Sequence, residues 1–200
     1  LQDSHTLSEQ FNKGAKLGEL TQLEANQGDR HCDGRSVFIC HFSSGLKLVY
    51  KPKPLSIDLA FQQFLAWVNR IGFQPKLPIL NILDCGEYGW CEFIDHTNCR
   101  SEDEVKRFYQ RQGAYLAIFY ALEATDFHYE NIIASGELPY LIDLETLLQP
   151  MLRDSTSVGP GSRLNIATIM RSGMMPNLHH TYRDKPMVDL SGLGNSPVSY

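Results

Sequence analysis

The sequence lacks a long run of basic residues, and its formal net charge is −5 at pH 7. Proteins that bind nucleic acid through its phosphates need clustered Lys and Arg, so this charge argues against nucleic acid as a main partner. No apolar stretch reaches transmembrane length, and no signal peptide is visible. We therefore expect no membrane partner and predict a cytoplasmic protein.

Cysteines are few, odd in number and scattered. They are Cys32, Cys40, Cys85, Cys91 and Cys99, and none of them forms a C-x-x-C pair. A disulfide framework would need paired cysteines, and a zinc site would need closely spaced ligands. We therefore predict reduced thiols, as in a cytosolic protein, and no zinc site within this chain.

The length and composition fit a globular protein, with 200 residues, 42% hydrophobic and 20% charged. This size allows one domain or a piece of a larger one. The chain begins at Leu1 rather than Met and stops at Tyr200, just after the turn-rich run 190–197. We interpret the sequence as an excerpt of a longer protein.

Residues 125–148 carry the strongest chemical pattern. Asp126 and Asn131 are spaced as D-x-x-x-x-N, and Asp143 follows twelve positions later, at the end of an apolar run. Phosphoryl-transfer sites use such a set: one Asp accepts the proton of the attacking hydroxyl, while Asn and a second Asp bind Mg²⁺. The alternative is a polar loop with Asp and Asn caps, which the D-x-x-x-x-N spacing alone would favour.

The spacing also predicts a small hairpin over 132–134 and 139–142, around the turn Ser135-Gly136-Glu137. Such a hairpin would return Asp143 to the pocket that holds Asn131. This return is what favours a phosphoryl-transfer site over a simple polar loop.

Lys51 ends the second strand of a predicted hairpin over 37–51, and prolines follow it directly. Kinase-like folds place the lysine that pairs with the nucleotide phosphates at the end of such a strand. A solvated lysine at a strand edge is the alternative. Lys53 is the rival if the register differs, and Glu92 is a candidate partner of Lys51.

Apolar periodicity predicts the remaining elements. They are a helical arm and loop over 1–27, a helix over 57–71, a hairpin over 79–94, a hinge at 95–99 that is the usual edge for adenine, and a long helix from 101. Leu17, Leu20 and Leu23 form the partial stripe of the arm. Ser101 and Glu104 fit a capping box at the start of the long helix.

Two features of protein kinases are missing. The helix over 57–71 carries no Glu to pair with the lysine, and no G-x-G-x-x-G loop precedes Lys51. These departures indicate a remote kinase-like fold rather than a protein kinase.

Six short motifs occur in a fixed order over roughly residues 28–195. They are Gly28-Asp29-x-His31-x-x-Gly34-x-Ser36-Val37, Tyr50-Lys51-Pro52, Tyr88-Gly89-Trp90 with Glu92-Phe93, Phe108-Tyr109-x-Arg111-x-Gly113, Asp126-x-His128-x-Glu130-Asn131 and Leu141-Ile142-Asp143-x-Glu145. In this order and spacing, the chain resembles the dehydratase domain of class II lanthipeptide synthetases.

The resemblance implies an α+β fold, lipid-kinase-like or protein-kinase-like with two lobes, of which this chain is a part. All of 1–200 would belong to one dehydratase domain, with 28–100 resembling the N-lobe and 101–200 the start of the C-lobe. Such domains use ATP and Mg²⁺ to phosphorylate Ser and Thr of a precursor peptide with a leader. They then eliminate the phosphate to leave dehydroalanine or dehydrobutyrine. A C-terminal cyclase domain, which holds Zn²⁺ and is absent here, adds cysteine thiols.

The resemblance also implies individual roles. Lys51 matches the phosphate-binding lysine, and Asp126 and His128 match the phosphorylation loop. Asn131 and Asp143 match metal ligands, with Glu145 beside them.

Asp29 and His31 match residues linked to elimination. That step needs a base for the weakly acidic α proton and a group that stabilises the enolate charge. From the residues alone, a self-capping turn would be the favoured explanation of Asp29 and His31.

Two parts of the family pattern are missing. A further arginine and threonine of the elimination step cannot be placed before Tyr200, and the cyclase is absent. The alternatives are therefore a phosphotransferase that stops at phosphorylation, or an inactive remnant that binds peptide.

Overall fold

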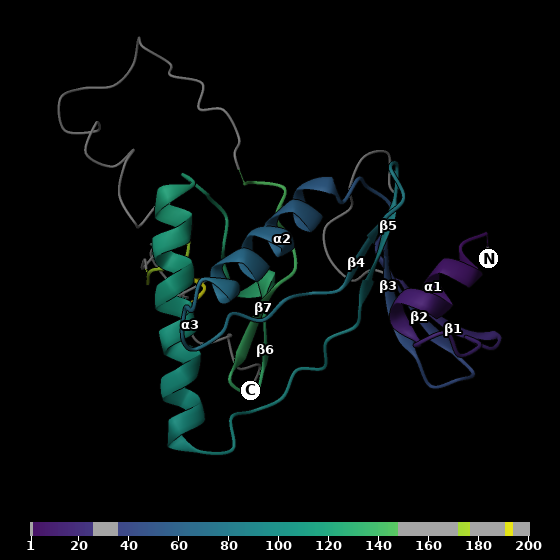
Figure 1. Ribbon diagram of the computed structural model, residues 1–200, viewed down its shortest axis with the longest axis horizontal. Coiled ribbons are helices and arrows are strands. Elements are labelled where there is room, and N and C mark those ends of the chain that lie inside the picture. Colours follow the sequence, from purple (N-terminus) through teal and green to yellow (C-terminus); the bar gives the residue numbers. More distant parts are fainter. Residues whose placement is uncertain (1, 26–35, 148–171, 177–190, 194–200) are drawn as a thin grey trace, which may run out of the picture. The chain divides into compact units, whose positions relative to one another are not determined.

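The computed structural model describes residues 2–25, 36–147, 172–176 and 191–193. The chain divides into two compact units, both drawn in Figure 1. The first unit comprises Leu1–Phe73 with Ile79–Ile94, and the second comprises Gln74–Pro78 with Asp95–Tyr200. Helices and a sheet occur together, so the described residues are α+β.

A five-stranded antiparallel sheet forms the frame of the first unit. Its strand order is β1-β2-β3-β5-β4. The strands are β1 (Leu20–Ala25), β2 (Phe38–Phe42), β3 (Lys47–Lys51), β4 (Ile82–Asp84) and β5 (Gly89–Glu92). The two predicted hairpins are confirmed as β2–β3 and β4–β5. The pairing of β3 with β5 joins them into one sheet.

The prediction of a helical arm over 1–27 is wrong for its second half. Helix α1 covers only Ser4–Phe11, and Leu20 and Leu23 lie in β1, which pairs with β2. Both leucines are exposed. Gly14 and Gly18 adopt positive φ angles of 79°, a conformation that L side chains rarely adopt, and they redirect the chain from helix to strand.

Side chains at both ends of helix α1 attach it to the sheet, since Gln10 Nε2 donates to the Ile82 carbonyl oxygen at 2.8 Å and Asp3 binds two residues from the N-terminal end. The Asp3 carboxylate accepts hydrogen bonds from Tyr88 Oη at 2.9 and 3.0 Å and from Trp90 Nε1 at 3.0 Å. The bond to Asp3 raises the pKa of Tyr88 to about 12. Trp90 is 3% exposed and packs in one cluster with Leu7 of α1, so it belongs to the core of the first unit.

Helix α2 (Ser56–Arg70) confirms the helix predicted over 57–71. Its buried residues include Phe61 and Leu65 but also Asp58 and Gln62, which an apolar stripe does not indicate. Gln62 Oε1 accepts a hydrogen bond from the backbone N–H of Leu80 at 2.9 Å. Such a partner stabilises a buried amide. Gln62 therefore links α2 to the segment that precedes β4.

The second unit contains a long helix and a hairpin. They are α3 (Glu102–Ala121), the short 3₁₀ helix η2 (Tyr129–Asn131), β6 (Ile132–Ser135) and β7 (Leu138–Leu141). Ser101 Oγ accepts from the N–H of Glu104 at 3.2 Å, while Glu104 Oε2 accepts from the N–H of Arg100 at 2.6 Å. The return bond of the predicted capping box is therefore shifted by one residue.

Strand β7 packs against α3, and its residues Pro139 and Leu141 are buried (Figure 1). Across the hairpin, Pro139 pairs with Ala134 and Ser135 with Leu138. This confirms the predicted hairpin, with a two-residue turn. Among the described residues, no helix is both long and apolar enough to cross a membrane.

Gly89 provides a test of the packing around β3. It pairs with Lys51, and a Cβ there would lie 2.4 Å from Leu55 Cδ1 and 2.8 Å from the Leu83 carbonyl oxygen. We expect Gly89→Ala to lower the free energy of unfolding by about 1–3 kcal/mol, because overpacking forces neighbours to shift. Chemical denaturation measures this change.

Gly113→Ala is the matched control. Gly113 lies inside α3, where a Cβ would have no atom within 4 Å other than the adjoining backbone of the helix itself, so Ala should stabilise the helix by up to about 1 kcal/mol. Equal stability of Gly89→Ala and the parent protein would contradict the packing described for Leu55.

Candidate functional site

The loop before η2 is attached to the core by Phe127. Its side chain is fully buried, and its ring lies 3.7 Å from that of Phe119 at an interplanar angle of 17°. Phe119 in turn stacks on Tyr115 of α3. Phe127 lies between Asp126 and His128 in the sequence. Its buried ring therefore fixes the position of the backbone that carries both of these polar side chains.

Asp126 adopts a left-handed backbone conformation, with φ of 68°, and its side chain is 56% exposed. Asp tolerates this region better than most residues, although such positions still cost about 1–3 kcal/mol and concentrate at functional sites. Asn131 Nδ2 donates to the Asp126 carbonyl oxygen at 2.7 Å. This bond uses the amide nitrogen, so it leaves the acceptor capacity of Asn131 Oδ1 unused.

His128 lies between the loop and η2. Its Nδ1 accepts a hydrogen bond from the N–H of Glu130 at 3.2 Å, which caps the 3₁₀ helix. Its Nε2 lies 3.6 Å from Asp126 Oδ1. An imidazole that accepts at Nδ1 carries its proton at Nε2, so His128 presents an N–H toward the carboxylate of Asp126.

The hairpin brings Asn131 and Asp143 to the same end, as predicted. Ile132 pairs with Leu141, and the N–H of Ile142 donates to the carbonyl oxygen of Asn131 at 3.1 Å. Asp143 is the next residue after Ile142. Because neighbouring strands lie only about 5 Å apart, the two predicted metal ligands lie on adjoining strand ends.

The segment after β7 returns to the start of the loop. Thr146 Oγ1 donates to the carbonyl oxygen of Thr125, and Leu144 is fully buried. Glu145, between these two residues, is exposed. Its neighbour Thr146 therefore contacts the residue that precedes Asp126, which places the backbone of Glu145 close to the start of the loop.

The predicted hinge at 95–99 pairs with the hairpin. The N–H of Thr97 donates to the carbonyl oxygen of Ala134, and the N–H of Gly136 donates to that of Thr97, both at 3.0 Å. Cys99 Sγ donates to the Gly136 carbonyl at 3.3 Å. The hairpin therefore occupies both backbone groups of Thr97, so an adenine edge would have to use the neighbouring residues.

Lys51 lies in the first unit, at the end of β3, and is 7% exposed. Its partner across the sheet is Gly89, whereas Glu92 pairs with Leu48. The Glu92 carboxylate accepts from the N–H of Asn81 at 2.6 Å, and burial raises the pKa of Glu92. The register thus separates Lys51 from Glu92. The rival Lys53 lies beyond the end of the strand and is half-buried.

The donor atoms at the hairpin end suit a hard cation. The carboxylate oxygens of Asp143 and the amide oxygen of Asn131 are the ligand types that Mg²⁺ prefers. In the described ranges, no group of three or more His, Cys, Asp or Glu residues could hold a metal ion. The structure therefore does not bring Asp126, His128, Asp143 and Glu145 together as one metal-binding group. The two predicted ligands, one acid and one amide, suit magnesium better than zinc.

Comparison with known proteins identifies the family. Residues 1–199 match the family described as Domain of unknown function (DUF4135). The chain belongs to this family. It is also 32% identical over 166 residues to the lacticin 481/lactococcin biosynthesis protein LcnDR2 of Lactococcus lactis subsp. lactis. That alignment covers 76% of this chain and 18% of the relative, so the chain spans less than a fifth of its length. The predicted family, that of class II lanthipeptide synthetases, is thereby confirmed.

Two residues predicted for this DUF4135 chain lie outside the described residues. Asp29 and His31, matched to elimination, belong to the range 26–35. Their roles stay predictions from the sequence.

Sequence reasoning missed the residues that pack on the loop from downstream. The N–H of Phe127 donates to the carbonyl oxygen of Ser172 at 2.8 Å, and His128 forms an antiparallel bridge with Ser191. The N–H of Gly192 donates to the carbonyl oxygen of Gly173 at 3.0 Å, which joins the two segments. The only feature of the sequence that marks these contacts is a Ser-Gly pair in each segment, Ser172-Gly173 and Ser191-Gly192. Such pairs also occur in ordinary turns, so they do not predict a contact with the loop.

Gly192 tests this contact with the loop. A Cβ there would lie 2.6 Å from the Phe127 carbonyl oxygen and 2.8 Å from Ile132 Cδ1. We expect Gly192→Ala to lower the free energy of unfolding by about 1–3 kcal/mol and to speed hydrogen exchange at the Phe127 amide. Unchanged exchange at Phe127, with Gly113→Ala as the reference, would show that the segment does not restrain the loop.

Proposed function

We propose that the protein containing this chain dehydrates Ser and Thr side chains of a lanthipeptide precursor peptide in an ATP-dependent reaction. Phosphorylation comes first, and elimination of phosphate then leaves dehydroalanine or dehydrobutyrine. A lipid-kinase-like, two-lobed fold is part of this proposal. The observation that supports it best is the convergence of Asp126, Asn131 and Asp143 at one end of the β6–β7 hairpin. The class II lanthipeptide synthetase family supports the substrate class.

In the phosphorylation step, ATP supplies the phosphoryl group and Mg²⁺ neutralises charge on the phosphates. Asp126 accepts the proton of the Ser or Thr hydroxyl while that oxygen bonds to phosphorus and the bond to ADP breaks. His128 orients Asp126 through its Nε2 proton. Asn131 and Asp143 would hold the metal, with Glu145 beside them, and Lys51 would contact the phosphate oxygens.

In the elimination step, a base removes the α proton of the phosphorylated residue. The carbon–oxygen bond breaks, phosphate leaves with that electron pair, and the electrons of the former C–H bond form the alkene. The α proton is weakly acidic, so a base and a group that stabilises enolate charge are both needed. We assign these roles to Asp29 and His31, with Lys51 stabilising the departing phosphate.

A phosphotransferase that stops at phosphorylation is the second candidate. Among the described residues, those at the hairpin end belong to the phosphorylation set, whereas Asp29 and His31 lie outside the described ranges. An inactive peptide-binding remnant is less compatible with a complete set of acid and amide groups. The complete natural protein, ATP, Mg²⁺ and a Ser/Thr-rich precursor peptide distinguish the candidates by mass. Loss of water supports dehydration, and retained phosphate supports the phosphotransferase.

The complete protein would also bind the leader of its precursor and carry a C-terminal cyclase domain. That domain, with Zn²⁺, would add cysteine thiols to the new alkenes. Ring formation is therefore proposed for the cyclase and not for this chain.

Asp126→Asn tests the phosphorylation step. We expect phosphate transfer to fall by at least about 10²–10⁴-fold, because the amide cannot accept the hydroxyl proton. Mass spectrometry of the peptide measures the transfer. Glu123→Gln is the matched control, since Glu123 is also exposed and also has a positive φ, of 53°. Equal transfer by Asp126→Asn and Glu123→Gln would contradict the role of Asp126.

His31→Ala tests the elimination step. We expect phosphopeptide to accumulate, because phosphorylation continues while proton removal or charge stabilisation is lost. The ratio of phosphorylated to dehydrated peptide is the measurement, and His5→Ala, at an exposed position of α1, is the control. Normal dehydration by His31→Ala would remove His31 from the mechanism.

A further inference from the structure

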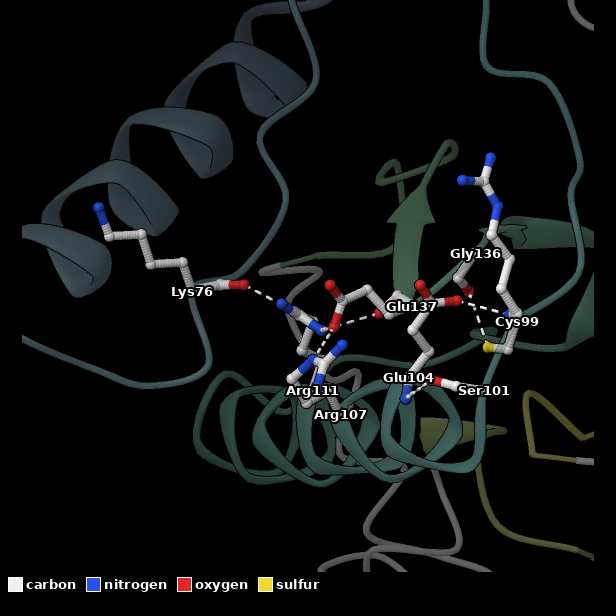
Figure 2. A network of polar contacts seen from close by, with 9 residues as sticks. Lys76, Cys99, Ser101, Glu104, Arg107, Arg111, Gly136 and Glu137 are labelled. Atoms are coloured by element: carbon white, nitrogen blue, oxygen red, sulfur yellow. Dashed lines mark hydrogen bonds and ion pairs between the residues drawn. The ribbon is translucent and has the colours of Figure 1, made fainter.

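Glu137 occupies the turn of the β6–β7 hairpin, at the end opposite to Asn131 and Asp143. Its carboxylate forms ion pairs with Arg107 Nε and, at 3.1 Å, with Arg111 Nη1. These two arginines lower the pKa of Glu137, the bond to Arg107 most. Figure 2 shows both side chains reaching from α3 to the turn.

Arg111 is the more enclosed of the two arginines, with a side chain 7% exposed against 41% for Arg107. Its Nε donates to the Lys76 carbonyl oxygen at 2.7 Å. Its Nη1 donates to the carbonyl oxygen of Glu137 at 2.9 Å as well as to its carboxylate. One planar guanidinium thus joins helix α3, the segment Gln74–Pro78 and the hairpin turn, all within the second unit (Figure 2).

The turn is held from the other side as well. Thr97 pairs with Ser135 in a parallel bridge, and Cys99 Sγ donates to the carbonyl oxygen of Gly136. A two-stranded hairpin alone is marginally stable in water, so its orientation depends on such contacts. The four-residue strands place the turn about 13 Å from the functional end, so neither Arg111 nor Glu137 touches the reacting atoms.

We propose that Arg111, through Glu137, is a positioning residue for the magnesium ligands Asn131 and Asp143. Arg111 holds the turn of the hairpin in place. Because the hairpin is short, the orientation of its turn also sets the orientation of its other end, where Asn131 and Asp143 lie beside the loop of Asp126. This inference rests on the proposed phosphorylation function. It assigns a role to the Phe108-Tyr109-x-Arg111-x-Gly113 motif, which the reaction itself does not use.

The experiment compares Arg111→Gln and Glu137→Gln in the complete natural protein with the Lys106→Gln control. Lys106 lies on the same helix, but its ion pair with Asp103 is exposed, with side chains 69% and 75% accessible. For both test variants, we expect the Mg²⁺ concentration that half-saturates phosphate transfer to rise about 10–100-fold. The KM for the precursor peptide should stay unchanged in both test variants. The Lys106→Gln control should keep the Mg²⁺ dependence of the parent protein.

Two additional variants separate positioning from loss of charge. Arg111→Lys should not restore Mg²⁺ dependence, because one ammonium group cannot reach the three acceptors of the guanidinium. The double variant Arg111→Gln/Glu137→Gln should lose less than the sum of the two single losses, because both variants remove the same ion pair between Arg111 and Glu137. Glu137→Gln keeps the test valid if Arg111→Gln fails to fold, because Glu137 is more exposed.

Hydrogen exchange supplies a readout besides activity. The Ile142 amide, which donates to Asn131, should exchange faster in Arg111→Gln at equal global stability. If the parent protein transfers no phosphate, the proposed function is wrong and this inference falls with it. If the parent is active while Mg²⁺ dependence and Ile142 exchange are unchanged in both variants, the inference alone is wrong.

Discussion

The hydrogen bond from the Ile142 amide to the Asn131 carbonyl is the contact on which the candidate site depends. It closes the open end of a hairpin whose register is fixed by a two-residue turn. A shift by one residue would turn the side chain of Asp143 to the opposite face of the strand. Buried Phe127 then sets the loop beside this closed end, and the amide of Asn131 connects the two.

The parts of the fold that sequence patterns predicted are local. Both hairpins of the first unit, helix α2, the Ser101 cap and the β6–β7 hairpin follow from alternation, turn residues and caps within a few positions. Strand β1 escaped prediction because an exposed edge strand needs backbone pairing but no apolar alternation. Asp58 and Gln62 escaped because a helix face can bury polar groups when the surroundings supply partners.

In the candidate site, too, the local contacts could be predicted from the sequence and the long-range contacts could not. Asp126, Asn131 and Asp143 could be grouped from spacing alone, because one loop and one hairpin connect them. The contacts of Ser172, Ser191 and Gly192 with the loop could not, because more than forty residues separate them from Phe127 and backbone groups carry no sequence code. The three acceptors of Arg111 likewise come from segments far apart in the chain.

Pro139 affects whether the outer edge of the hairpin can pair with a strand of another chain. It faces Ala134 at a position between ladder hydrogen bonds, so its nitrogen points away from β6. An ordinary residue there would present an N–H at the outer edge of β7, in a buried place that would require a partner. Proline removes that donor. The outer edge of the hairpin is therefore a poor template for a further strand, which limits edge-to-edge association between chains while the protein folds.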